Sequence, residues 1–206
     1  MSALPFMLNV DKMSIVVVGG GSVALKRTKA LVHAGGFVHV IAPTILPEFL
    51  QLSEEGFVSV EKRAVGLSEC FIAELVFLCS NDAVLHEKIY EQKAPRQHVY
   101  LCDQAQIGDF YVPAKIEKGL LTVSVSTAGA SPSYTKRLKN EIELILPEYA
   151  EEELYFLQQA RRRTLHLSVN KTKKLALLKE LASPVILQKD DREEWFEKRC
   201  EELERE

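Results

Sequence analysis

The chain has 206 residues, of which 47% are hydrophobic, and its formal net charge at pH 7 is −3. This length and apolar content predict a globular protein with a sizeable core. The near-balanced charge argues against a dedicated nucleic-acid binder, and no apolar run reaches the ~20 residues of a membrane-spanning helix.

The amino-terminal stretch MSALPFMLNVDKM contains no charged segment followed by an apolar one, so it predicts no signal peptide. The cysteines lie at positions 70, 79, 102 and 200 without CxxC spacing, which predicts neither a zinc site nor a disulfide framework. We expect Cys79 and Cys102, which lie in apolar runs, to be buried thiols. A reducing cytoplasm is the predicted location.

Short apolar runs alternate with helical patterns over the first hundred residues. Strands are predicted at 14–19, 37–43, 57–63, 73–80 and 98–103, and helices at 22–34, 47–56 and 81–94. The third helix is expected to begin after an N-cap at Asn81 or Asp82. Nearly continuous apolar strands joined by helices are typical of a parallel sheet covered on both faces. With right-handed crossovers, this predicts an α/β fold with a doubly wound, Rossmann-like parallel sheet.

Three consecutive glycines stand between the first predicted strand and the first predicted helix. Gly19, Gly21 and Ala24 fit the pattern GxGxxA. In that pattern the first glycine permits a tight turn, the second lets a pyrophosphate approach the backbone, and the small third residue lets helix and strand pack closely. Ser22 and Val23 would open the helix and offer its free N–H groups to phosphates. The pattern predicts a bound dinucleotide; the alternative is a packing turn without a cofactor.

One feature of dinucleotide-binding proteins is missing from this region. About 20 positions after the glycines, an acidic residue usually holds the ribose 2′-OH. Pro43 and Thr44 stand there instead, without an adjacent arginine. The motif therefore does not decide between NAD and NADP. Pro43 and Thr44 are candidate cofactor contacts, although Thr44 could equally cap the next helix.

The alternation of strands and helices ends after the fifth predicted strand. Two further strands are predicted around 109–113 and 120–126, with 115–119 between them. A helix is predicted from Ser131 or Ser133 up to Pro147. A strand pair and one helix cannot form a core alone, so we expect this region to pack against a second copy of the chain.

The remaining residues predict a charged helical tail. The sequence therefore divides into a dinucleotide-binding domain (1–112), a dimerisation region (113–146) and a small helical domain (147–206).

Four segments in this order resemble the precorrin-2 dehydrogenase family: GGGSVALKR, SNDAV, LCDQAQIGDFYVPA and VSVSTAGASPSYTKRLKNEIELILP. The family comprises the dehydrogenase–ferrochelatase module of siroheme synthase and its stand-alone relatives. The resemblance covers roughly residues 4–165, and its S-x-x-G-x-S-P segment is not a general Rossmann feature. It implies a homodimer that oxidises precorrin-2 to sirohydrochlorin with NAD in siroheme biosynthesis. No nucleic-acid or membrane partner is expected.

The resemblance also implies roles for individual residues. Asp103, at the end of the fifth predicted strand, would take part in the chemistry; without the resemblance we would interpret it as a cap. A carboxylate in a partly dry cleft can serve as the base while the cofactor accepts the hydride. The hydroxyl positions of the family fall on Ser126 and Thr127. Because the substrate carries many carboxylates, Lys136 and Arg137 are candidate substrate contacts.

The sequence does not decide whether Thr127 is phosphorylated or whether the protein inserts a metal ion. Ala128 stands where many family members have glycine, which makes a positive φ less favourable and leaves phosphorylation of Thr127 open. Histidines 33, 39, 86, 98 and 166 are isolated in the sequence, so no metal site is predicted and insertion of Fe²⁺ or Co²⁺ stays open. The alternative function is a non-catalytic module that senses NAD(H), which would lack the STAGASP segment.

Overall fold

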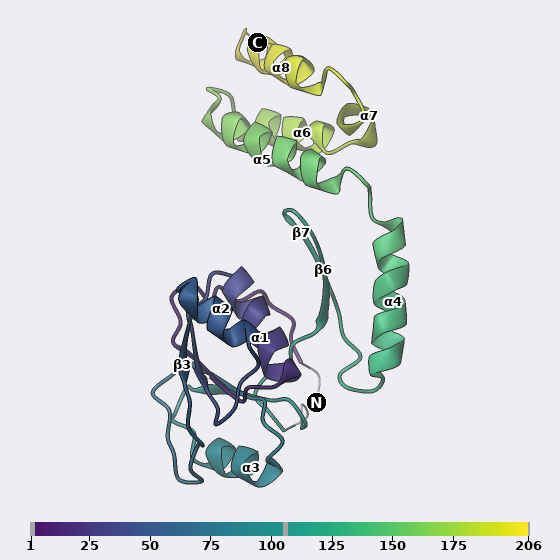
Figure 1. Ribbon diagram of the computed structural model, residues 1–206. Helices are drawn as coiled ribbons and strands as arrows, with labels where there is room; N and C mark the ends of the chain where they lie inside the picture. The colour runs from purple at the N-terminus through teal and green to yellow at the C-terminus, as the bar shows by residue number, and fades with distance from the viewer. Residues whose placement is uncertain (1–2, 105–106, 206) are drawn as a thin grey trace. The chain divides into compact units, whose positions relative to one another are not determined.

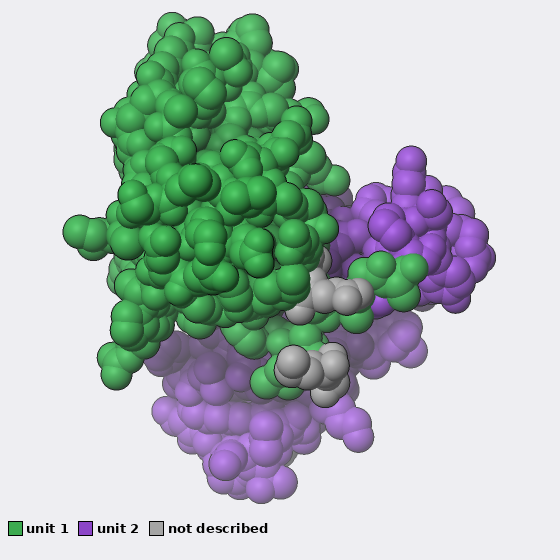
Figure 2. Space-filling view, turned by 90° about the horizontal axis from the view of Figure 1, so that it is seen from below, with its two compact units in different colours: residues 1–112, 128–130 green, residues 113–127, 131–206 purple. Residues whose placement is uncertain are grey.

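The computed structural model describes residues 3–104 and 107–205, and the chain divides into two compact units. The first unit comprises residues 1–112 and 128–130, and the second comprises residues 113–127 and 131–206 (Figure 2). The helical domain expected at 147–206 and most of the dimerisation region expected at 113–146 fall in the second unit, whereas residues 128–130 belong to the first. Their separation stays a prediction.

The first unit alternates strands and helices. Its strands are β1 (Ile15–Val18), β2 (Val38–Ile41), β3 (Val58–Glu61), β4 (Leu75–Leu78) and β5 (His98–Leu101), and its helices are α1 (Ser22–His33), α2 (Glu48–Glu54) and α3 (Ala83–Glu91). The strands form a parallel sheet in the order β3-β2-β1-β4-β5, which confirms the predicted fold class. The chain order reverses between β1 and β4, and such a reversal is where doubly wound sheets bind ligands, outside the carboxyl ends of the strands.

Each face of this sheet has its own apolar core, because successive residues of a strand point to opposite sides. Helices α1 and α2 cover one face and α3 covers the other (Figure 1). On the first face, Val17 of β1 packs with Phe49 of α2. On the second face, Leu78 of β4 packs with Leu85 and Ile89 of α3. The sheet is thereby fixed from both sides, and its carboxyl edge becomes a rigid platform.

Two helix starts left ambiguous by the sequence are decided by their caps. Asp82 is the N-cap of α3, because its Oδ1 atom accepts a hydrogen bond from the Leu85 N–H at 2.9 Å. Ser131 is the N-cap of α4 (Pro132–Ile145), where its Oγ atom accepts from the Tyr134 N–H at 3.2 Å. A side-chain acceptor at this position satisfies one of the free N–H groups of a helix start.

The second unit contains a hairpin followed by helices. The elements after residue 112 are β6 (Ala114–Lys118), β7 (Leu121–Val125), α4, α5 (Ala150–His166), α6 (Lys171–Leu181), α7 (Pro184–Leu187) and α8 (Arg192–Arg205). β6 and β7 are antiparallel, with Ala114 paired to Val125. The helices from α5 onward share a core that includes Phe156, Leu181 and Phe196.

The strand predicted around 109–113 is wrong. The first strand of the hairpin is Ala114–Lys118, so the residues expected to connect the two strands form β6. The turn lies at Gly119, whose φ of +53° suits a tight hairpin turn. Phe110 and Val112, whose apolar character favoured a strand, instead pack against the core of the first unit. Phe110 makes an edge-to-face contact with Phe77 at 5.4 Å between ring centroids.

Candidate active site

The glycine turn between β1 and α1 is the first element of the site. Gly19 has a φ of +127°, and a Cβ atom there would lie 2.5 Å from the carbonyl oxygen of Cys79. The Gly19 N–H donates to the Ile41 carbonyl at 3.0 Å. Only glycine fits this conformation and this approach to the end of β4.

Gly20 has a role that the sequence pattern did not reveal. A Cβ atom at Gly20 would lie 2.0 Å from the carbonyl oxygen of Thr44. The Gly20 carbonyl also accepts a hydrogen bond from the Leu46 N–H at 3.0 Å. The missing side chain therefore lets the turn after β1 pack directly on the segment after β2.

Gly21 differs from its two neighbours because it faces open space. No atom lies within 4 Å of a Cβ built there, outside its own chain neighbours. Gly21 is the N-cap of α1 and offers no side-chain acceptor to the helix. The next two residues, Ser22 and Val23, are exposed, whereas Ala24 is completely buried against the sheet. Free N–H groups at an open helix start attract an anion, so this end of α1 fits a dinucleotide pyrophosphate.

Pro43 and Thr44 follow β2 and are both exposed. The alternative role of Thr44 as a helix cap is wrong, because α2 begins after an N-cap at Pro47. A contact of Pro43 and Thr44 with the cofactor stays a prediction.

The second element of the site is a chain of hydrogen bonds beside β4 and β5. The Oγ atom of Ser80 lies 2.8 Å from Nε2 of His86, and Nδ1 of His86 lies 3.0 Å from Oδ1 of Asp103. His86 is completely buried, whereas the Asp103 side chain is 36% exposed. The expectation that His86 is isolated is thus wrong, because folding places it between two polar side chains.

The register of the sheet explains this meeting. Leu78 pairs with Leu101, and Ser80 and Asp103 each stand two residues beyond that pair. α3 begins at Ala83, three residues after Ser80, and its first turns bury His86 together with Leu85. The sequence did contain a signal for this. His86 lies one turn after the N-cap Asp82, between the apolar positions Leu85 and Ile89, which indicates a buried histidine.

Two cysteines lie side by side at the same edge. Cys79 is 6% exposed, as predicted, but Cys102 is half-buried. A hydrogen bond between the thiols, together with burial, raises the pKa of Cys79. The same hydrogen bond lowers the pKa of the Cys102 thiol, against the effect of burial. Cys102 therefore reaches the thiolate form before Cys79.

Arg27 adds a positive charge near these residues. Its Nη2 group donates to the Tyr100 hydroxyl at 2.8 Å, and its guanidinium carbon lies 5.0 Å from the centre of the Tyr100 ring. Burial raises the pKa of Tyr100, and Arg27 opposes that effect. Arg27 comes from the second turn of α1, so the helix that opens at the glycine turn also carries a cation to the end of β5.

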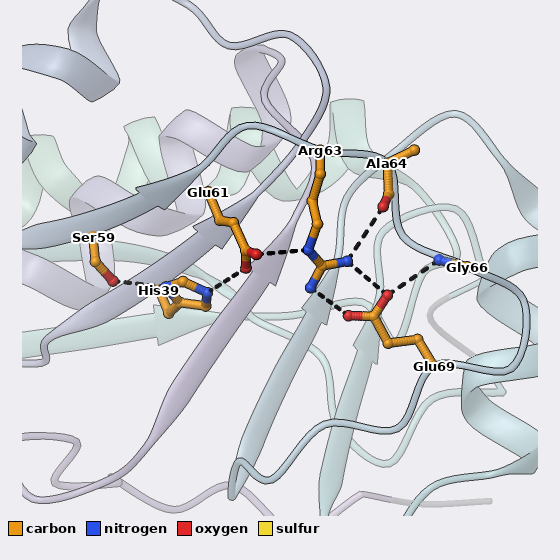
Figure 3. Close-up of polar contacts among 7 residues, drawn as sticks. All are labelled: His39, Ser59, Glu61, Arg63, Ala64, Gly66 and Glu69. Carbon is orange, nitrogen blue, oxygen red and sulfur yellow. Dashed lines mark hydrogen bonds and ion pairs between the residues drawn. The ribbon is translucent and has the colours of Figure 1, made fainter.

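A third polar group lies around the end of β3 (Figure 3). His39 contacts Ser59 through Nδ1 at 2.7 Å and Glu61 through Nε2 at 3.3 Å. Arg63 donates to Glu61 at 2.8 Å and makes two bonds to Glu69, at 2.7 and 2.6 Å. Hydrogen bonds from Arg63 lower the pKa of both carboxyl groups. This group ties the segment after β3 to the sheet edge.

The other candidate residues lie in the second unit. Ser126, Lys136 and Arg137 are exposed, and Arg137 pairs with Glu141 at 2.6 Å. The hydroxyl of Thr127 lies 2.9 Å from that of Thr135 and accepts from the Ser131 N–H at 3.3 Å. Thr127 thus fastens the loop to the start of α4. Their contact with a substrate stays a prediction.

The fold and the glycine turn define a dinucleotide-binding α/β protein. A family model described as "Putative NAD(P)-binding" matches residues 6–114, and one described as "Sirohaem biosynthesis protein central" matches residues 118–143. No helix within the described residues is long and apolar enough to span a membrane.

Known proteins make the assignment more specific. The chain is 32% identical over 160 residues to the precorrin-2 dehydrogenase of Bacillus subtilis (strain 168), covering 78% of this chain and 99% of that protein. It is 29% identical to the precorrin-2 dehydrogenase of Priestia megaterium, covering 85% and 87%. A solved structure of SirC, a precorrin-2 dehydrogenase, matches with a TM-score of 0.86 and 26% identity, over 97% of this chain and 100% of that one. The chain belongs to the precorrin-2 dehydrogenase family.

Siroheme synthases are also similar, but only in part. That of Nitrosococcus oceani is 30% identical over 149 residues, which is 72% of this chain and 32% of that protein. The chain therefore corresponds to about a third of a siroheme synthase.

Proposed function

We propose that this protein oxidises precorrin-2 to sirohydrochlorin with NAD, in siroheme biosynthesis, and that Asp103 is the base. One structural observation carries the role of Asp103. Its exposed carboxylate is held by a buried histidine at the same sheet edge as the open glycine turn. Family membership supports the reaction and its cofactor.

The cofactor fits the residues at this edge. The pyrophosphate would lie in front of Gly21, against the N–H groups of Ser22 and Val23, with Pro43 and Thr44 toward its ribose. When bound there, NAD supplies the hydride acceptor. The oxidation removes a hydride and a proton from the tetrapyrrole, so the protein has to supply a group that takes the proton.

Asp103 suits this role because both its position and its orientation are fixed. A donor–acceptor chain is complete when the Ser80 hydroxyl donates to Nε2 and the Nδ1–H group of His86 donates to Oδ1 of Asp103. One carboxylate oxygen is then occupied and the other is left for the substrate. Ser80 and His86 are positioning residues, since they act on the substrate only through Asp103.

The test compares Asp103→Asn with the wild type. Asparagine retains the size and the hydrogen-bonding oxygen but cannot accept the proton, so we expect turnover of precorrin-2 to fall ~10²–10⁴-fold. Sirohydrochlorin absorbance measures turnover, while thermal unfolding and NAD affinity serve as controls. Turnover within about threefold of the wild type, in a folded variant that binds NAD, would remove Asp103 from this role.

The second unit supports a homodimer. Among the described residues of α4 none is buried, and Leu144 and Ile145 are 86% and 79% exposed. Apolar side chains of this size on a helix without a buried face need a covering surface, and a second copy provides one by symmetry. Light scattering of the purified protein would yield about twice the chain mass of 23.2 kDa. A mass of one chain at micromolar concentration would contradict the dimer.

Four polar residues of the second unit are the proposed substrate contacts. Lys136 and Arg137 are exposed cations on α4, and Ser126 and Thr127 lie just before that helix. We expect these residues to bind the carboxylates of the tetrapyrrole. We also expect the protein to work in the cytoplasm.

A further inference from the structure

Three side chains at the end of β5 form a group that the dehydrogenase reaction does not explain. His86, Cys102 and Asp103 each offer one ligand atom, and these atoms all lie within 4.8 Å of one another. They supply an imidazole nitrogen, a sulfur and a carboxylate oxygen. Nothing in the removal of a hydride and a proton requires a thiol at this point.

The hydrogen bond between Ser80 and His86 permits two proton arrangements. A hydroxyl both donates and accepts, so His86 can carry its proton on either ring nitrogen. With the proton on Nδ1, His86 donates to Asp103. With the proton on Nε2, His86 donates to Ser80, and its Nδ1 lone pair faces the Asp103 oxygen 3.0 Å away. Lone pairs on two atoms at that distance repel each other, and a cation between the atoms removes this repulsion.

This second arrangement is the one that metal-binding histidines adopt. Such a histidine donates its other N–H group to a neighbouring acceptor, which fixes the ring and its tautomer. Ser80 provides that acceptor here. The ion can enter from solvent, because Asp103 is exposed and Cys102 is half-buried.

We propose that His86, Cys102 and Asp103 bind a divalent transition-metal ion such as Co²⁺ or Zn²⁺, with Ser80 orienting His86. Thiolate and imidazole ligands favour these ions over Mg²⁺ and Ca²⁺. Three protein ligands leave one coordination position open. Binding releases the thiol proton of Cys102, while the proton of His86 moves from Nδ1 to Nε2.

Under the proposed function, on which this step rests, an ion held by Asp103 occupies the carboxylate that would accept the substrate proton. Metal binding and dehydrogenation therefore exclude each other at this residue, and Zn²⁺ inhibits turnover of precorrin-2.

The experiment is a Co²⁺ titration of the full-length protein without NAD or tetrapyrrole. A Cys70→Ser background removes the exposed thiol. We expect one equivalent of Co²⁺ to produce thiolate-to-cobalt charge-transfer absorption. Cys102→Ser removes this absorption, whereas Cys79→Ser, which changes the neighbouring thiol outside the group, retains it. No absorption in the background protein, or absorption that survives Cys102→Ser, overturns the proposal.

A second measurement avoids changing the buried histidine. Ser80→Ala removes the acceptor for Nε2–H, so we expect Co²⁺ affinity to fall ~10–100-fold. Unchanged affinity would overturn the role of Ser80. Because binding is measured without turnover, the metal site can fail while Asp103 remains the base. Conversely, an Asp103→Asn variant with near-wild-type turnover would remove Asp103 as the base and leave the metal result standing.

Discussion

The buried His86 holds the exposed Asp103 through a 3.0 Å contact between Nδ1 and Oδ1. The Oγ atom of Ser80 lies 2.8 Å from Nε2, the other ring nitrogen of His86. A carboxylate held this way keeps one orientation without losing its access to solvent. The pair belongs to the first unit, which also carries the glycine turn, so this unit contains both the proposed cofactor contacts and the proposed base.

Ser80→Ala tests whether this chain positions Asp103 during catalysis. Without the hydroxyl, His86 no longer favours the tautomer that donates to Asp103. Loss of one neutral hydrogen bond corresponds to ~1 kcal/mol, so we expect kcat to fall ~3–10-fold. The KM for NAD should not change. Nitrogen-15 NMR of His86 would report the change in tautomer populations.

A matched control is Ser59→Ala, which removes a similar serine–histidine contact, the 2.7 Å contact with His39, at the end of β3. This variant should leave kcat unchanged. Equal kcat values for the wild type and Ser80→Ala, or equal losses in both variants, would contradict a positioning role for Ser80.

The glycine turn predicts opposite results for two neighbouring substitutions. Gly21→Asp should fold normally, because its side chain enters open space, but the carboxylate would repel the pyrophosphate and abolish NAD binding. Gly20→Ala should instead lower the thermal midpoint, because its Cβ would lie 2.0 Å from the Thr44 carbonyl. Calorimetry measures the first effect and thermal unfolding the second. Unchanged NAD affinity in folded Gly21→Asp would argue against the dinucleotide site.

Ala128 should limit the stability of the loop before α4. Its φ is +50°, a left-handed conformation that glycine adopts with less strain. Ala128→Gly should therefore raise the free energy of unfolding, by less than ~1 kcal/mol because glycine also gains entropy in the unfolded chain. Ala130→Gly, two residues away, is the control and should lower it. Urea unfolding would show both effects, and a destabilised Ala128→Gly would contradict the expectation.

The ion pairs of Arg63 with Glu61 and Glu69 should make a pH-dependent contribution to the free energy of unfolding. Hydrogen bonds from Arg63 lower the pKa of Glu61 and Glu69 below the ordinary value of 4.5. A carboxyl group with a lowered pKa in the folded state stabilises the protein above its unfolded pKa, and this contribution is lost as the pH falls through the folded pKa. Arg63→Gln should therefore destabilise the protein at pH 7.

Urea unfolding of the wild type and of Arg63→Gln at several pH values measures this pH dependence. The difference between the wild type and Arg63→Gln should shrink steadily as the pH falls below 4.5. A difference that stays constant down to strongly acid pH would show that Arg63 acts through packing rather than through the charges of its partners.

Much of the first unit follows from local patterns in the sequence. The apolar runs predict the strands of the sheet, and the GxGxxA pattern predicts the turn after β1 and the start of α1. Asp82 and Ser131 fit their cap positions because a cap depends on residues only a few positions away. The family could also be recognised from short segments, since their order is specific.

The hairpin shows where local patterns fail. Apolar residues at 110 and 112 have the alternation of a strand, but they pack as part of a connecting segment. The real strand, Ala114–Lys118, contains three charged residues and is mostly half-buried. Its apolar signal is therefore weak, and only its pairing with β7 defines it.

The tertiary structure alone decides the contacts within the site. Gly20 is obligatory because the segment after another strand approaches it, and no pattern at residues 19–24 contains that contact. His86 and Asp103 are 17 residues apart in the chain and meet because parallel pairing aligns the ends of β4 and β5. Sequence periodicity determines which side of an element a residue faces. The register between elements, set by packing over the whole sheet, determines which side chains come within hydrogen-bonding distance.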